Sequence, residues 1–124
     1  MFGNRPGSIV IEPVPGRVRG FAGGAVLVDT TDAVLLREGS RSPVYYFPLE
    51  HVAPGALIPS EHTSHCAVKG EAIYYSVRLP GGRIADNGVW RYPRPIAGVE
   101  AIAGRVAFYP HVLDRIVVGE DEAG

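Results

Sequence analysis

Cysteine is nearly absent from this sequence, because Cys66 is the only one among 124 residues. A single thiol excludes an intrachain disulfide and any metal site that needs two thiolates, such as the paired Cys-x-x-Cys sites of structural zinc. A chain without a disulfide framework fits a reducing compartment. We therefore expect a cytoplasmic protein with no metal and no other cofactor.

The sequence also lacks an excess of charge and a long apolar run. Twelve Lys and Arg residues oppose 13 Asp and Glu residues, and the formal net charge is −1. The basic residues are scattered, whereas a duplex-binding surface gathers them in a patch or stripe. No stretch approaches the roughly 20 apolar residues of a membrane span, and Met1–Ile11 lacks the apolar region of a signal peptide. We expect neither a duplex nucleic acid nor a membrane as partner.

Chain breakers are abundant, with 16 Gly and 11 Pro, and they argue against long helices. Ala72–Leu79 alternates with period two, as a half-buried strand does. Short helical turns are expected near Glu50 and Ile96. These features predict a single all-β domain, a sandwich or barrel-like fold. The expected strands are 17–21, 25–29, 33–36, 44–47, 67–69, 72–79, 83–85, 89–92 and 105–109, with 111–118 open between a helical turn and a strand.

The two ends of the chain differ from its centre. Residues 1–16 are expected to form a Pro/Gly-rich arm, in which Glu12–Gly16 cannot make a regular ladder because proline removes amide donors. The arm is still able to cover a sheet edge. Residues 17–118 form the expected β domain, and 119–124 an acidic tail that frays.

A polar segment, Ser60–Gly70, concentrates two histidines, a thiol, a lysine and several hydroxyls. A core strand does not carry so many polar groups, since burying them without partners is costly. Nine of the eleven Phe, Trp and Tyr residues lie between Tyr45 and Tyr109. Aromatic walls with a few polar groups are typical of small-molecule pockets, although single aromatics are more often core residues.

The polar segment has four interpretations. His62 and His65, with His51 and His111, are metal-ligating residue types, but positions three apart on a strand face opposite ways. Cys66 with a histidine base would be a nucleophile pair. Recognition of a polar or anionic ligand is favoured, with hydrogen bonds from the histidines and a cation from Lys69. A polar network that pins two sheets together is the structural alternative.

The order of several strings resembles one family, called domain of unknown function 427, found in bacteria and fungi. The strings are Val44–Pro48, Pro59–Gly70, Tyr74–Val77, Val89–Pro93 and Ile102–Tyr109. The resemblance covers about residues 17–116, and the arm lies outside it.

This resemblance implies a β-tent, in which two small antiparallel sheets lean together at a steep angle. Similar folds occur in methionine sulfoxide reductase B and in the thalidomide-binding domain of cereblon, which carry a structural zinc on two Cys-x-x-Cys pairs. This chain cannot hold that zinc. The family also has a nucleotidyltransferase-like label, but Glu61, Asp86 and Asp114 do not form the carboxylate pair that such chemistry favours.

We expect one concave pocket to collect the polar segment and the neighbouring aromatics. The predicted ligand-binding residues are Tyr46, His62, Thr63, His65, Lys69, Tyr75, Trp90 and Tyr109. If the pocket is catalytic, the candidates are His62, His65, Lys69 and Cys66. Cys66 can instead face the core as a small apolar residue.

Three classes of function follow from this pocket. The favoured one is binding of a small planar ligand, such as a nucleobase, a nucleotide or a cyclic imide-like metabolite. The second is a small enzyme, hydrolase or nucleotidyltransferase-like, with His62 or His65 as general acid–base. The third is a structural or partner-binding protein. Exposed sheet edges also favour a homodimer.

Overall fold

Two antiparallel sheets make up the protein in a computed structural model that describes residues 8–119. The larger sheet has seven strands in the order β1-β4-β5-β9-β8-β7-β6, and the smaller has the order β10-β2-β3. Within these residues the helical segments are three single 3₁₀ turns, at Leu49–His51, Pro80–Gly82 and Glu100–Ile102. The all-β prediction with two antiparallel sheets is therefore confirmed. The strands are β1 (Ile9–Pro13), β2 (Val18–Ala22), β3 (Ala25–Thr30), β4 (Val34–Glu38), β5 (Val44–Pro48), β6 (Leu57–Cys66), β7 (Gly70–Arg78), β8 (Ile84–Arg91), β9 (Arg105–Phe108) and β10 (Arg115–Val118).

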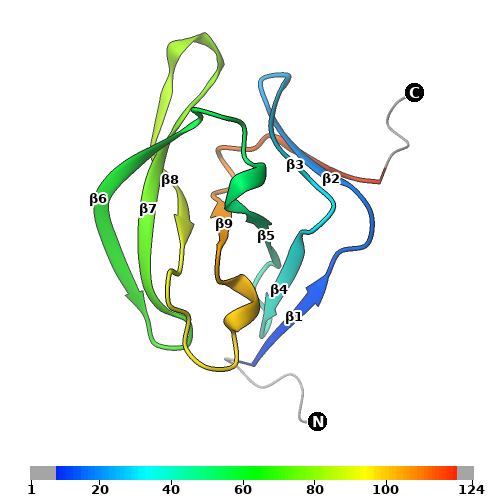
Figure 1. Cartoon of the computed structure of the whole chain (residues 1–124), viewed down its shortest axis with the longest axis vertical. Coiled ribbons are helices and arrows are strands. Elements are labelled where there is room, and N and C mark those ends of the chain that lie inside the picture. The colour runs from blue at the N-terminus through cyan, green and yellow to red at the C-terminus, as the bar shows by residue number, and fades with distance from the viewer. Residues whose placement is uncertain (1–7, 120–124) are drawn as a thin grey trace.

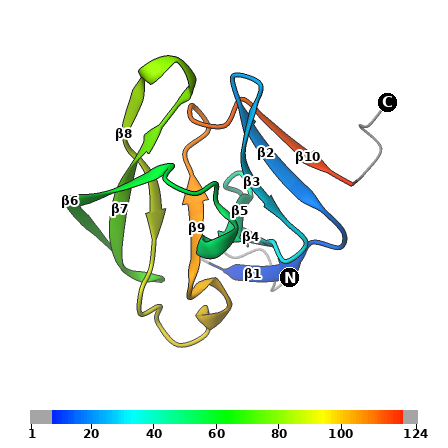
Figure 2. The ribbon, with the colours of Figure 1, turned by 45° about the horizontal axis from the view of Figure 1, so that its top comes forward.

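The larger sheet is strongly curved. In Figure 1, β6, β7 and β8 lie on one side, β5, β4 and β1 lie on the other, and β9 runs between them. Figure 2 shows β10, β2 and β3 side by side as a separate layer. The curvature gives the larger sheet a hollow inner face, and its other face packs against the smaller sheet.

Both faces of the central strands are buried, in two separate apolar clusters. Phe47 and Val106 pack with Val18 and Val28 of the smaller sheet. The preceding Tyr46 joins a second cluster on the other face of the larger sheet. Successive side chains of a strand point to opposite faces, so neighbouring residues enter different clusters. This explains why β5 reads as a continuous apolar and aromatic run without alternation.

Several strand predictions were wrong in detail. β6 extends over Leu57–Cys66, where no strand was expected. The prediction failed because β6 is an edge strand whose residues are mostly polar and exposed, so they show no apolar alternation. Residues 67–69, expected as a strand, form the turn between β6 and β7. Residues 86–88 were expected to form a bend or bulge between two strands. They lie within a single strand, β8, and form a bulge there, because the register with β7 shifts between Tyr75↔Val89 and Val77↔Ala85.

The prediction for Glu12 and Pro13, near the start of the chain, was also wrong. Ile9–Pro13 pairs along its whole length with β4, although a regular ladder was not expected at Glu12 and Pro13. Pro13 is the last residue of an edge strand, a position where its missing amide does not interrupt a ladder. The predicted covering of a sheet edge thus takes the form of strand addition. Residues 1–7 and the tail beyond 119 lie outside the described residues, and the domain boundaries and the homodimer stay predictions.

The fully buried valines of the first cluster set the stability of the fold. We expect Val77→Ala to lower the free energy of unfolding by about 2–4 kcal/mol, because Val77 is 0% exposed and the lost methyl groups leave a cavity. Val10→Ala is the matched control: it is also a strand valine, 48% exposed, and should change stability by no more than about 0.5 kcal/mol. Urea unfolding of both variants measures the difference, and equal losses would contradict this description of the core.

Candidate functional site

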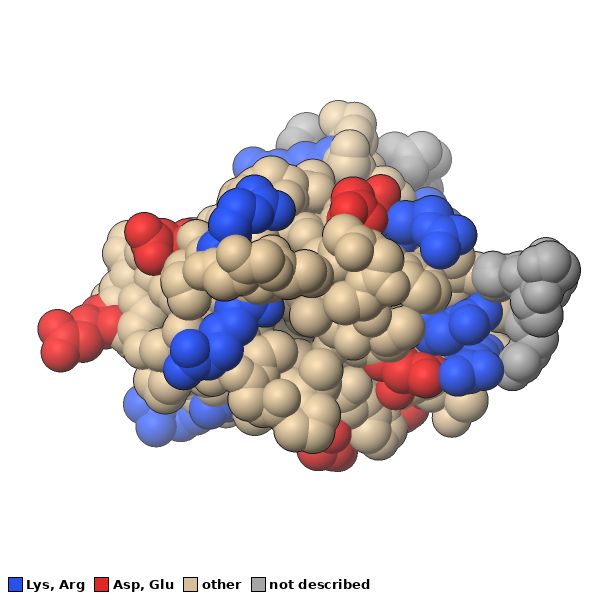
Figure 3. Space-filling model, turned by 90° about the horizontal axis from the view of Figure 1, so that it is seen from above, with Lys and Arg blue, Asp and Glu red and all other residues tan. Residues whose placement is uncertain are grey.

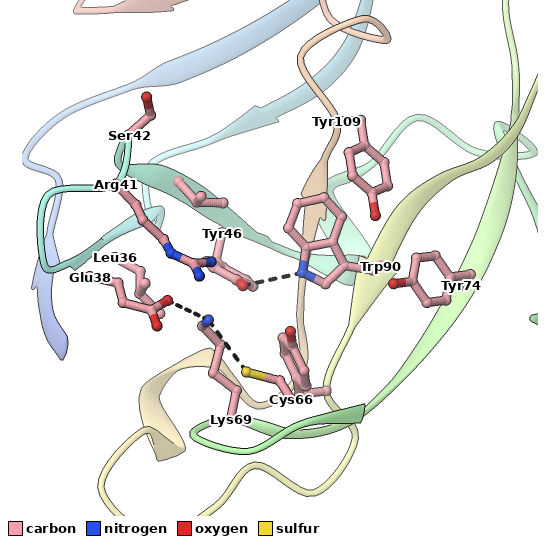
Figure 4. A pocket seen from close by; sticks show the side chains of 12 residues that line it. Leu36, Glu38, Arg41, Ser42, Tyr46, Cys66, Lys69, Tyr74, Trp90 and Tyr109 are labelled. Carbon is pink, nitrogen blue, oxygen red and sulfur yellow. Dashed lines mark hydrogen bonds and ion pairs between the residues drawn. The ribbon is translucent and has the colours of Figure 1, made fainter. Parts of the chain in front are cut away.

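A cavity of about 300 Å³ opens on the inner face of the larger sheet. We call it the tyrosine pocket, because four of its lining residues are tyrosines. Figure 4 shows the indole of Trp90 between Tyr46 and Tyr109, with Tyr74 beyond it and Lys69 and Cys66 at the base. The lining residues are Leu36, Glu38, Arg41, Ser42, Val44, Tyr46, Cys66, Lys69, Tyr74, Trp90, Tyr92 and Tyr109.

Strand register brings the aromatic side chains together. Trp90 on β8 lies opposite Tyr74 of β7 on one side and opposite Ala107 of β9 on the other. The small Ala107 leaves room beside the indole, and Tyr46 meets the indole edge to face with ring centroids 6.4 Å apart. The indole Nε1–H donates a hydrogen bond to Tyr46 Oη at 3.2 Å. The indole is therefore held in one orientation.

A buried ion pair forms the base of the pocket. Lys69 Nζ lies 2.7 Å from Glu38 Oε1, and the two side chains are 10% and 12% exposed. The ammonium also lies 3.8 Å from Cys66 Sγ. Lys69 comes from the turn after β6, and Glu38 from the end of β4, so the pair joins opposite walls of the curved sheet.

The turn that carries Lys69 needs a glycine after it. Gly70 has φ 117°, a conformation that residues with a Cβ rarely adopt. A Cβ there would also lie 3.2 Å from the carbonyl oxygen of Arg94. The amide of Ile96 donates to the Lys69 carbonyl at 2.9 Å. Backbone geometry thus requires Gly70, whereas Lys69 contributes to the pocket through its ammonium.

Arg41 adds a second cation at the pocket. Its guanidinium points into the cavity near Tyr46 in Figure 4, and its residue is exposed. The loop that carries it closes with a hydrogen bond from the Arg41 amide to the Glu38 carbonyl at 3.0 Å. With Lys69 paired to Glu38, the charged residues of the lining carry one net positive charge.

Four of the eight predicted binding residues line the tyrosine pocket: Tyr46, Lys69, Trp90 and Tyr109. Cys66, a candidate for catalysis, lines it as well and also packs against the second apolar cluster. The other four predicted residues, His62, Thr63, His65 and Tyr75, lie outside its lining. A single cavity shared by Lys69 and both histidines is not formed.

Strand alternation explains these exclusions. Ser64 and Cys66 face the same way as Tyr74, and Ser64 Oγ lies 2.8 Å from Tyr74 Oη. The His62 ring contacts the Tyr74 ring at 4.5 Å between centroids, but His62 is not part of the pocket lining. Thr63 and His65 alternate to the opposite face and are exposed.

Tyr75 was predicted as a binding residue, whereas its neighbour Tyr74 lines the pocket. Tyr75 faces the first apolar cluster, and its hydroxyl accepts a hydrogen bond from Arg91 Nε at 2.8 Å. The alternation in Ala72–Leu79 indicates that Tyr74 and Tyr75 lie on opposite faces of the strand. The alternation does not indicate which of the two faces borders a cavity. Other lining residues that were missed are Leu36, Glu38, Arg41, Ser42, Val44 and Tyr92.

Burial raises the pKa values of three phenols of the pocket, those of Tyr46, Tyr92 and Tyr109. Desolvation raises the pKa of Tyr46 to about 12, with an opposing contribution from the Trp90 hydrogen bond. Burial likewise raises the pKa of Tyr92 above its usual value of 10.0 and that of Tyr109, which Tyr74 raises further. These hydroxyls are therefore hydrogen-bond donors or acceptors near neutral pH and do not act as anions.

The four histidines do not come together. His51 Nδ1 is 2.8 Å from Thr30 Oγ1, and the ring of His111 stacks on Tyr109 at 5.8 Å. Within residues 8–119 no group of three or more His, Cys, Asp or Glu side chains is placed to hold a metal ion. Over the same residues, no helix has the length and apolar character needed to cross a membrane.

The fold and the cavity define a small all-β protein with an aromatic pocket. The family model described as domain of unknown function (DUF427) matches residues 10–119, so the chain belongs to that family and the resemblance is confirmed. The match begins within the expected arm, further toward the start of the chain than the quoted strings. A comparison with curated proteins found no match.

The Lys69–Glu38 pair should be important for stability. Lys69→Met leaves the Glu38 carboxylate buried without its partner, and we expect a loss of about 3–5 kcal/mol in the free energy of unfolding. The double variant Lys69→Met/Glu38→Leu should recover most of it. Arg37→Met is the control, since Arg37 and Glu12 pair at 3.7 Å with about half of each side chain exposed and should cost about 1 kcal/mol at most. A double variant as unstable as Lys69→Met would refute the pairing argument.

The raised tyrosine pKa values predict a loss of stability at high pH. The unfolded chain releases the Tyr46 proton near pH 10 and the folded chain near pH 12, so the folded state binds more protons between these values. The free energy of unfolding therefore falls as pH rises through this window, by up to about 3 kcal/mol for Tyr46. Denaturant unfolding at pH 9 to 12 measures the slope. Tyr46→Phe should reduce it, whereas Tyr45→Phe, on the opposite face, should keep the slope of the unmodified protein.

Proposed function

We propose that the protein binds a small planar ligand, of the size of a nucleobase, nucleotide or cyclic imide, in the tyrosine pocket. The observation that carries this proposal is the gathering of aromatic side chains from β5, β7 and β8 around one cavity with two cations at its rim and base. Its volume of about 300 Å³ lies at the lower end of the range for ligand pockets.

The polar groups favour a ligand with hydrogen-bonding edges. Neutral phenols, the Ser42 hydroxyl and the Arg41 guanidinium supply donors around the aromatic walls. The surplus positive charge of the lining favours a ring that carries an anionic substituent over an uncharged ring.

Binding is favoured over acid–base catalysis by the positions of the histidines. A general base must reach the proton it moves within about 3 Å, or through one water. His62 lies outside the pocket lining and contacts the Tyr74 ring, and His65 alternates to the other face. The enzyme alternative, whether hydrolase or nucleotidyltransferase-like, would need a ligand that extends beyond the pocket lining to reach one of these histidines. A purely structural role would not require a cavity.

The surface charge supports a small ligand over a duplex. On the face seen in Figure 3, basic and acidic side chains are interspersed, whereas a duplex-binding face presents a continuous basic area.

Trp90 provides a direct test, because it is the only tryptophan in the chain and it lines the pocket. The test titrates uracil, succinimide, orotate and UMP into the protein and follows Trp90 fluorescence. We expect saturable changes in the fluorescence, and we expect orotate to bind more tightly than uracil. Arg41→Gln should weaken the binding of orotate about fivefold, because an exposed charge pair contributes about 1 kcal/mol. The same change should leave the binding of uracil nearly unchanged. Arg83→Gln, an exposed arginine outside the pocket lining, is the control.

The outcomes separate the three classes of function. No saturable fluorescence change with any of the four compounds would defeat the binding proposal. Chemical conversion of a bound compound that is lost in His62→Ala would favour the enzyme.

A further inference from the structure

A second cavity of about 320 Å³ lies next to the tyrosine pocket. We call it the apolar pocket, because Tyr45, Phe47, Phe108, Leu113 and Ile116 supply most of its wall together with two prolines. It is on the other face of β5, since Tyr45 and Phe47 alternate with Tyr46. The Tyr45 and Phe47 rings stack with centroids 6.1 Å apart.

The two pockets share part of their walls. Ser42, Val44, Trp90 and Tyr109 line both of them. The Trp90 and Tyr109 rings lie against each other, with centroids 4.6 Å apart and planes tilted by 50°. One pair of aromatic rings is therefore the partition between a polar and an apolar cavity.

The backbone ladder beside the shared walls is short. Among the described residues, β5 pairs with β9 at Phe47↔Val106 and Pro48↔Arg105. No pair is formed between Val44–Tyr46 and β9, although these residues pair with β4. Val44, at the start of β5, and Tyr109, which follows β9, line both pockets.

We propose that the two pockets are parts of one site, whose ligand is a planar polar ring with an apolar aryl or short alkyl substituent. The ring occupies the tyrosine pocket, as in the proposed function on which this inference rests, and the substituent passes Trp90 and Tyr109 into the apolar pocket. The four residues that line both pockets, beside the short β5–β9 ladder, support one continuous ligand over two separate ones.

The chemistry of the apolar pocket fits such a substituent. Its wall is mainly aromatic and aliphatic, with few groups able to hold water. Each methylene moved from water into an apolar site tightens binding about fourfold. A three-carbon substituent that is fully buried should therefore gain at least tenfold in affinity.

The test compares uracil with 1-propyluracil, 5-propyluracil and 6-propyluracil, each titrated by Trp90 fluorescence. The three isomers direct the propyl group from different ring positions and so sample three directions out of the tyrosine pocket. We expect at least one isomer to bind at least tenfold more tightly than uracil.

Two matched variants locate the gain. Ile116→Glu places a carboxylate at the apolar pocket and should remove most of the propyl advantage, while uracil binds as before. Ile84→Glu makes the same change at an isoleucine outside both pockets and should keep the advantage. Ile116 is 37% exposed and Ile84 46% exposed, so both variants are expected to fold, as circular dichroism would verify.

Each result bears on one of the two proposals. If uracil binds and no propyl isomer binds more tightly, the two-part site is wrong and the proposed function stands. If a propyl advantage survives Ile116→Glu unchanged, the substituent lies elsewhere and the inference is again overturned. If none of these four compounds binds, the two-part site is wrong, and the proposed function fails with it only if succinimide, orotate and UMP do not bind either.

Discussion

The ion pair between Lys69 and Glu38 closes the curved sheet on which the pocket depends. In the order of the larger sheet, β4 and β7 are separated by β5, β9 and β8. Tyr46 lies on β5, Trp90 lies on β8, and Tyr109 directly follows β9. A flat sheet would hold Lys69 and Glu38 far apart, since neighbouring strands are spaced by about 4.8 Å. Their contact at 2.7 Å therefore requires the sheet to bend around the aromatic side chains.

A buried charge pair is not by itself a favourable way to hold two walls together. Removing both charges from water costs several kcal/mol, and apolar residues of similar size often stabilise as well. Lys69 and Glu38 belong to a polar pocket lining that also contains the Cys66 thiol and several tyrosine hydroxyls. An all-apolar base would make the same bend but would offer no charge to a ligand.

Pairing is short at the centre of the larger sheet, where the cavities lie. β9 forms two residue pairs with β5 and two with β8. Aromatic side chains of these strands and their ends, Tyr46, Trp90 and Tyr109, line the tyrosine pocket beside this short ladder. Departures from regular structure are common at functional sites.

The residues themselves determined the fold class and the family, and they named four of the residues that line the tyrosine pocket. Glycine and proline at short intervals exclude long helices, whereas the turn at 67–69 was expected as a strand and became visible only in the structure. The arrangement in space decided the rest. Alternation divides Tyr74 from Tyr75 and Cys66 from His65 onto two faces, but the bending of the sheet decides which face is hollow. Glu38 and Arg41 lie far from Lys69 in the chain and carry no local signal, because only the pairing of β4 with β5 brings them to the pocket.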